Sequence, residues 1–230
     1  TLPILLYREP QHAAKTAQKT TPFSWQAVRQ YLGYFRQSRS LALWLWVLLS
    51  FKIADGLSGP LLKPLMVDLG LSFSQIGIYV TMLGAFAALL GAGVAGLLLR
   101  VMSRAQALVL FSVLKVLALA AYSWLAYQYE QQQAVALWLI YLINALEDGI
   151  SAMLLVVMLT LVMHYSRKQL AGTDFTFQVA LMATVSGGLY SLSGILGDQL
   201  GYARYLMMIS GIALLCLLPI LVWARSLPKD

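Results

Sequence analysis

Six long apolar runs decide what this chain can fold into. A helix that crosses a membrane needs about 20 consecutive, mostly apolar residues. Polar or charged segments separate the runs, which cover residues 41–62, 75–99, 105–127, 134–163, 174–197 and 203–224. In lipid, backbone groups must be satisfied within the segment, as they are in a helix. The sequence therefore predicts an all-α membrane protein whose six transmembrane helices form one bundle.

The composition excludes an ordinary soluble domain. Hydrophobic residues make up 60% of the chain and charged residues only 11%, which is far from the average of soluble proteins. The net charge of +7 does not indicate a nucleic-acid partner, because the basic residues lie mostly between the apolar runs. Positive charge in such loops sets the orientation of a membrane protein.

No motif indicates an enzyme, a metal site or a cofactor. The two histidines, His12 and His164, lie outside the apolar runs and suggest no metal site. There is no G-x-S-x-G nucleophile elbow and no phosphate-binding loop. We therefore expect no catalytic residue, no bound metal and no cofactor.

The basic residues between the runs predict the topology, because cytoplasmic loops carry an excess of Lys and Arg. One side has only Lys63 and Arg204. The other side has twelve: Arg8, Lys15, Lys19, Arg29, Arg36, Arg39, Arg100, Arg104, Arg167, Lys168, Arg225 and Lys229. This bias places both termini in the cytoplasm, and an even number of spans agrees with it.

The first forty residues differ from the rest. Residues 1–6 contain a short apolar stub that we interpret as the end of a preceding transmembrane helix. Residues 7–40 are polar and basic, and from Phe23 to Arg36 aromatic residues mix with arginines. This pattern predicts a cytoplasmic linker with a helix in the membrane interface; a plain linker is the alternative. Residues 41–224 would form the bundle and 225–230 a cytoplasmic tail.

Five ionisable residues lie deep inside the apolar runs: Lys52, Asp55, Lys115, Glu147 and Asp148. A charge at the centre of a span costs about 2.5–3.5 kcal/mol on insertion scales, so such residues commonly mark a solute pathway. Three acids stand against two bases. One acid is therefore expected to be protonated, hydrated or paired with another segment.

Lys52 and Asp55 are three residues apart, on one face of a helix. They are either a structural ion pair or residues of a transport cavity that exchange partners. Gly56, Gly59 and Pro60 follow at once; they weaken the helix and allow a bend beside the pair.

Glu147 and Asp148 lie near the middle of the fourth run. Adjacent helical residues point about 100° apart, so we expect one to pair with a cation and the other to meet the cavity. Neighbouring acids resist joint ionisation, which makes one of them a candidate proton carrier. Asn144 is placed to hydrogen-bond Asp148. Lys115 is the expected partner of one acid; the alternative is pairing with basic residues elsewhere in the protein.

Asp174 and Gln178 complete the set of candidate pathway residues. We expect Thr173 or Asp174 to cap the fifth span. Gln178, one turn further in, could reach substrate. Glycines recur in the second run (Gly84, Gly91, Gly93 and Gly96) and in the fifth (Gly187, Gly188, Gly194 and Gly197). We interpret them as surfaces for close helix packing.

Several local motifs resemble one group of transporters. Lys52-x-x-Asp55, the stretch LLKPLMVDLGLS at 61–72 and Ile76-Gly77 are similar to the permease group that contains the muropeptide permease AmpG and acetyl-CoA transporters. Glu147-Asp148-Gly149 and the stretch AGTDFTFQ at 171–178 resemble its siderophore-permease branch, the RhtX/FptX type. The AmpG pattern at the last site more often reads Thr-Ala-Thr-Gln-Tyr, from which this chain departs.

The resemblance covers nearly the whole chain and implies the C-terminal half of a major facilitator superfamily transporter. Such transporters consist of two six-helix bundles joined by a basic cytoplasmic linker, so the six runs would be helices seven to twelve and the N-terminal half would be missing. In that fold the first and fourth helices of each half line the cavity. The third is usually peripheral, so the resemblance gives Lys115 no place at the cavity.

The function that the resemblance implies is that of a permease in the bacterial inner membrane. It would import a small solute, a ferric siderophore, by proton-coupled alternating access. Asp55, Glu147 or Asp148 would bind the proton, and Lys52 would attract an anionic group of the substrate. A muropeptide permease of the AmpG kind is the alternative; a non-transporting membrane subunit or a truncated product is an alternative of another class. The expected partners are the substrate, protons, the bilayer and the missing half.

Overall fold

The computed structural model describes residues 33–35 and 37–227, and the regular structure in them is helical. Residues 33–35 form a helical turn. The elements that follow are α3 (Arg39–Phe51), α4 (Ile53–Asp68), α5 (Phe73–Gln75), the π-helix η2 (Ile76–Met82), α6 (Leu83–Leu98), α7 (Arg104–Glu130), α8 (Leu137–His164), the 3-10 helix η3 (Lys168–Leu170), α9 (Ala171–Leu200) and α10 (Tyr202–Ser226). The predicted all-α fold is confirmed for these residues. The expected end of a preceding helix and most of the expected interfacial helix lie outside them.

Six helical segments are long and apolar enough to cross a membrane. They are Arg39–Asp68, Phe73–Leu98, Arg104–Glu130, Leu137–His164, Lys168–Leu200 and Tyr202–Ser226. Each corresponds to one of the six apolar runs, with ends that shift by a few residues. The chain has the helices of a multi-pass membrane protein.

The first span is interrupted at Lys52 itself, and the helix that follows continues through Gly56, Gly59 and Pro60, where the sequence allowed a bend. Lys52 has φ −96° and ψ 3°, which separates α3 from α4. α4 then continues through Pro60. Gly56 serves close packing instead, because a Cβ atom there would lie 2.7 Å from the carbonyl oxygen of Ser186 on α9.

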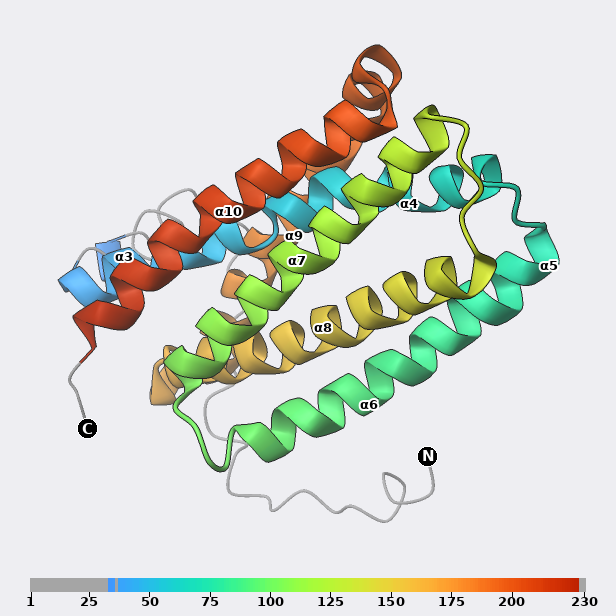
Figure 1. Ribbon diagram of the computed structural model, residues 1–230. Coiled ribbons are helices and arrows are strands. Elements are labelled where there is room, and N and C mark those ends of the chain that lie inside the picture. The colour runs from blue at the N-terminus through green and yellow to red at the C-terminus, as the bar shows by residue number, and fades with distance from the viewer. Residues whose placement is uncertain (1–32, 36, 228–230) are drawn as a thin grey trace.

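The spans pack in pairs. α7 lies along α10, α6 along α8 and α4 along α9, while α7 also contacts α8 and α3 contacts α10 (Figure 1). The apolar stretches of the second and fifth spans are only 22% and 11% buried, against 33–44% for the other four. α6 and α9 are therefore the outer helices of the described bundle.

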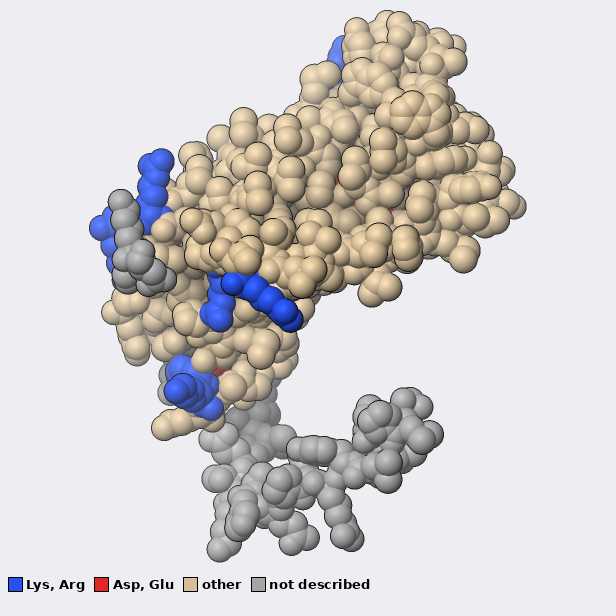
Figure 2. Space-filling model, turned by 60° about the horizontal axis from the view of Figure 1, so that its bottom comes forward, with Lys and Arg blue, Asp and Glu red and all other residues tan. Residues whose placement is uncertain are grey.

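The basic residues of the described loops gather at one end of the bundle. The start of α3, the end of α10, the α6–α7 connection and the α8–α9 connection meet there (Figure 1). Figure 2 shows most of the blue side chains at this end. The basic residues of these segments are Arg39, Arg100, Arg104, Arg167, Lys168 and Arg225. We call this end the basic end; the sequence predicts that it faces the cytoplasm.

Two apolar clusters fill the interior, one above the other along the spans. The cluster at the basic end includes Trp44, Phe111 and Trp223. The cluster at the opposite end includes Tyr122 and Tyr205. Along α7, Lys115 lies between the part that joins one cluster and the part that joins the other, so a polar layer separates them.

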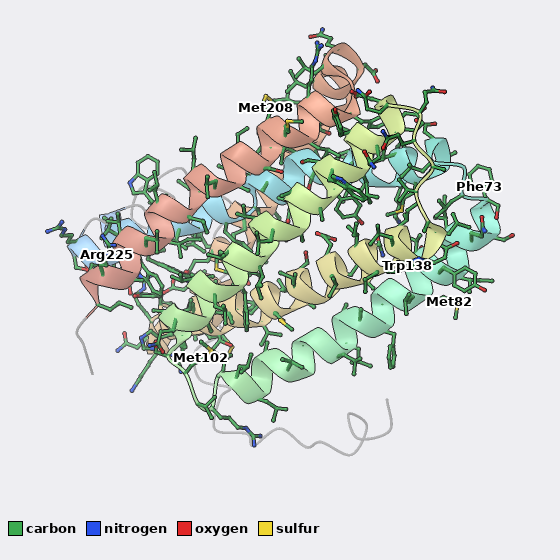
Figure 3. The ribbon with its side chains drawn as sticks, viewed as in Figure 1. Phe73, Met82, Met102, Trp138, Met208 and Arg225 are labelled. Atoms are coloured by element: carbon green, nitrogen blue, oxygen red, sulfur yellow. The ribbon has the colours of Figure 1, made fainter. Side chains whose placement is uncertain are left out.

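The outer surface of the spans is apolar, as a bilayer requires. Met82 is 66% exposed, and it and the exposed Met208 lie on the outer faces of their helices (Figure 3). Trp138 is 65% exposed near the start of α8. Exposed side chains of this size would be unfavourable in water and are stable in lipid.

Candidate functional site

Lys115 of α7 is the centre of the polar layer. Its ammonium lies 2.8 Å from Oδ1 of Asp55 on α4, forms an ion pair with Oε1 of Glu147 on α8, and donates to the hydroxyl of Ser151 at 2.6 Å. The three N–H groups of a lysine ammonium thus have three oxygen acceptors. Lys115 is 6% exposed. The charge is buried but fully partnered, which makes its presence in an apolar span tolerable.

The location of Lys115 corrects one expectation. The resemblance gave the third span a peripheral place, yet Lys115 joins the first and fourth spans from the inside of the bundle. The residue-level prediction that it pairs with one of the two acids of the fourth span is confirmed for Glu147. The physical reason is the packing of α7 against both α8 and α10, which places α7 in the interior.

Asp55 forms ion pairs with two lysine side chains. Its Oδ2 lies 2.6 Å from the ammonium of Lys52, and its Oδ1 faces Lys115. The predicted Lys52–Asp55 pair is confirmed. The side chain of Lys52 is 28% exposed and its ammonium also lies 5.4 Å from the ring centre of Phe51. Lys52 can leave this pair more easily than Lys115, because Lys115 is anchored on three sides.

Glu147 and Asp148 take different partners, as predicted for adjacent residues of a helix. Glu147 accepts from Lys115 and, at 3.0 Å, from the hydroxyl of Ser151 one turn later. Asp148 accepts from the Asn144 amide at 2.9 Å, which confirms the predicted Asn144 contact. Among the described residues, no basic side chain forms an ion pair with Asp148.

The amide of Asn144 has a fixed orientation. Its Nδ2 donates both to the carbonyl oxygen of Val80, at 3.1 Å, and to Oδ2 of Asp148. Its Oδ1 accepts from the hydroxyl of Tyr122 at 3.0 Å. A carbonyl oxygen can only accept, so the amide nitrogen must face Val80. Val80 lies in the π-helix η2, and π-helical turns are frequent at functional sites.

Gly84 leaves the space that the Asp148 carboxylate occupies. A Cβ atom on Gly84 would collide with Oδ2 of Asp148 and lie 3.0 Å from Nδ2 of Asn144. α6 therefore needs glycine at this position. The acid lies against the backbone of α6 on one side and faces a cavity on the other.

The cavity has a volume of about 410 Å³ and lies between α4, η2, α6, α7 and α8. This volume is within the usual range of small-molecule sites. Asp55, Glu147, Asp148 and Lys115 contribute to its wall, and Lys63 of α4 joins them. The polar residues of the wall are Asp55, Ser58, Lys63, Thr81, Lys115, Asn144, Glu147, Asp148 and Ser151. We call this the central cavity.

Lys52 is not part of the central-cavity wall, although the sequence suggested that it attracts substrate. A second, smaller cavity of about 40 Å³ is lined in part by Ser112 and Cys216, and Asp55 and Lys115 contribute to its wall as well. Lys63 lines the central cavity and forms no ion pair with any described acid.

Asp174 and Gln178 lie away from the central cavity, at the basic end. Asp174 is not the helix cap that the sequence predicted, because α9 already begins at Ala171. Its carboxylate accepts from the backbone N–H of Arg167 at 2.9 Å and from both Nε and Nη2 of the same arginine at 2.8 Å. The guanidinium also lies 4.7 Å from the ring centre of Tyr34. Asp174 therefore fixes the α8–α9 connection.

Gln178 is 1% exposed and fully engaged with protein groups. Its Oε1 accepts from the indole N–H of Trp44 at 2.8 Å, and its Nε2 donates to the carbonyl oxygen of Val162 at 3.3 Å. Trp44 stacks on Tyr165, with ring centres 4.8 Å apart. Gln178 lies inside this aromatic cluster and not on the wall of the cavity.

We predict that Gln178→Leu destabilises the bundle by about 1–3 kcal/mol, because it leaves the buried indole N–H of Trp44 without an acceptor. Unfolding by dodecyl sulfate in mixed micelles measures the change. The matched control is Gln199→Leu, at an exposed position of the same helix, which should change stability by less than about 0.5 kcal/mol. Equal effects of the two substitutions would contradict the role of the buried amide.

The site residues that the sequence did not predict include Lys63, Ser151, Tyr122 and Gly84. Ser151 was detectable, because it follows Glu147 by four residues and so lies on the same helix face. Tyr122 and Gly84 reach the site from other helices, and no local spacing points to them. They depend on which spans pack together.

Comparison with known proteins gives no family. No protein-family model matches this chain, and no solved structure matches it. The fold and the site by themselves define a multi-pass helical membrane protein with a buried, three-span ion-pair network beside a central cavity.

Proposed function

We propose that this chain forms one six-helix half of a secondary transporter of the major facilitator superfamily type. In this proposal it is a permease of the bacterial inner membrane that imports a ferric siderophore by proton-coupled alternating access. The cavity would be closed on its open side by a second six-helix bundle, because alternating access rocks one bundle against another around a site near the midplane.

One observation carries the proposal: costly charges from three spans converge on a cavity. Asp55, Lys115 and Glu147 come from the first, third and fourth spans and meet within hydrogen-bonding distance. A structural ion pair alone would need no open volume beside it. Intramembrane charges that face a cavity are typical of substrate and ion pathways.

The substrate class rests on the resemblance of the sequence motifs and on Lys63. Ferric siderophores carry oxygen-rich, often anionic groups around the iron, and an unpaired ammonium in the cavity wall would attract them. Lys63 takes the role that the sequence suggested for Lys52, because Lys63 lines the central cavity and Lys52 does not. Lys52 instead shares Asp55 with Lys115, each ammonium pairing with a different carboxylate oxygen.

The proposal is tested by uptake into cells that express the full-length protein and lack their own siderophore permease. We expect accumulation of radiolabelled ferric siderophore that stops when the proton gradient is collapsed. Competition by anhydro-muropeptides but not by siderophores would select the muropeptide permease. Absence of transport of both would favour a non-transporting membrane subunit.

We predict that Lys63→Gln raises the KM for an anionic siderophore about fivefold, the effect of losing about 1 kcal/mol of attraction. Lys63→Arg should restore most of the affinity, because it restores the charge. The control is Arg204→Gln, which removes a charge at the start of α10, outside the cavity wall. An unchanged KM in Lys63→Gln would remove this residue from the pathway.

A further inference from the structure

The three acids of the central cavity differ in what holds them. Asp55 is paired with two ammonium groups, and Glu147 is paired with Lys115 and hydrogen-bonded by Ser151. Within the described residues, the hydrogen-bond partner of Asp148 is the neutral amide of Asn144. To take up a proton, Asp55 or Glu147 would have to break an ion pair that joins two spans. Asp148 can take up a proton without breaking an ion pair among the described residues.

The contact with Asn144 leaves one oxygen of Asp148 for the cavity. Because the carbonyl of Val80 fixes the amide orientation, Asn144 presents an N–H group to Oδ2. Oδ2 has one lone pair engaged by this N–H group and lies against Gly84 of α6, so Oδ1 is the more open position for proton uptake. Asp148 lines the central cavity and is neither fully buried nor fully exposed. The carboxyl group of Asp148 is therefore held in one orientation by Asn144 and is accessible from the central cavity.

The charged and titratable groups around Asp148 come from three helices. α4 contributes Asp55 and Lys63, α7 contributes Lys115 and Tyr122, and α8 contributes Glu147. The residues that η2 and α6 place in the cavity wall are Val80, Thr81, Gly84, Ala85 and Ala88, none of which is titratable. Asp148 thus faces an uncharged wall on the α6 side.

We propose that Asp148 is the carboxyl group that binds and releases the transported proton, and that Asn144 is its positioning residue. This inference rests on the proposed transport function. Protonation forms one O–H bond at Oδ1, and release to the opposite side breaks the same bond, so no other bond changes. Asp55 and Glu147 stay ionised and hold Lys115 between the spans. The π-helical turn of η2 is tied to the proton site through Val80 and Asn144.

The test is chemical and needs no substrate. A hydrophobic carbodiimide adds to a protonated carboxyl group within a membrane and forms a stable N-acylurea, whereas ion-paired carboxylates react poorly. The full-length protein in membranes is treated over a range of pH, and mass spectrometry locates the adduct. We expect modification at Asp148 that increases as the pH falls, is absent in Asp148→Asn and persists in Asp198→Asn, which removes an exposed acid of α9.

Modification of Glu147 or Asp55 in place of Asp148 would overturn the inference, and so would the absence of any modification of these three acids in folded protein. A modified Asp148 in a protein that fails to import siderophores would overturn the proposed substrate alone. Uptake by Asp148→Glu with an altered pH profile, but none by Asp148→Asn, supports a proton-binding role; normal proton-driven uptake by Asp148→Asn contradicts it.

Discussion

Lys115→Met is expected to lower the free energy of unfolding by about 3–5 kcal/mol, because removal of one partner leaves an uncompensated charge inside the bundle. Asp55 still pairs with Lys52 in this variant, whereas Glu147 loses its ion-pair partner. Most of the loss of stability therefore comes from the unpaired Glu147 carboxylate. Methionine is unbranched and keeps most of the length and volume of the lysine side chain, so the effect is mainly the loss of charge. Unfolding by dodecyl sulfate in mixed micelles gives the difference.

Two further variants distinguish an orphaned charge from general damage. Adding Glu147→Gln to Lys115→Met should restore part of the lost stability, because the amide removes the charge and can still accept from Ser151. Lys63→Met, which removes a lysine that pairs with no acid in the described part of the chain, should change stability by less than about 0.5 kcal/mol. A double variant no more stable than the single one would contradict this account.

The contacts that the sequence predicted are those within one helix. Lys52 with Asp55 and Asn144 with Asp148 are three and four residues apart, and helix geometry alone brings such pairs together. The ion pair between Lys115 and Glu147 was anticipated only as one of two possibilities, because charge balance suggests partners but not positions. Its bridge to Asp55 depends on how α4, α7 and α8 pack, and no spacing along the chain encodes that.

For the fold too, properties of single segments were predictable, whereas features that depend on contacts between helices were not. The six runs predicted the six spans, since length and hydropathy are properties of each segment by itself. The interruption at Lys52 and the π-helical turn of η2 were not predicted. The π-helical turn has a partner on another helix, because the Val80 carbonyl accepts from Asn144 of α8. Nothing in the structure explains the interruption at Lys52.

The glycines of the second span show most clearly that the sequence does not reveal which residues face another helix. Sequence reasoning assigned Gly84, Gly91, Gly93 and Gly96 the same packing role. The structure separates them: Gly84 and Gly91 face α8 at close range, whereas a Cβ atom on Gly93 or Gly96 would meet nothing within 4 Å. Gly84 and Gly91 are seven residues apart and so lie on one face of α6.

Gly91→Leu is therefore expected to destabilise the bundle by about 3 kcal/mol, at the upper end of the range for overpacking. A Cβ atom on Gly91 would collide with the carbonyl oxygen of Gly149 and lie 3.0 Å from its Cα atom. These are backbone atoms, so no side-chain rotation can relieve the contact and α6 must move away from α8. That movement would also separate Gly84 from Asp148, two turns away, and so should reduce transport as well as stability.

Gly93→Leu is the matched control, because it makes the same substitution two residues away on the open side of α6. It should leave stability unchanged or raise it slightly, since leucine favours the helix by somewhat less than about 1 kcal/mol over glycine. Gly91→Ala should fall between the two, because a single methyl group requires a smaller shift. If Gly91→Leu and Gly93→Leu unfolded at the same dodecyl sulfate fraction, the backbone of α6 would not lie against Gly149. The position of Asp148 between Asn144 and Gly84 would then lose its support.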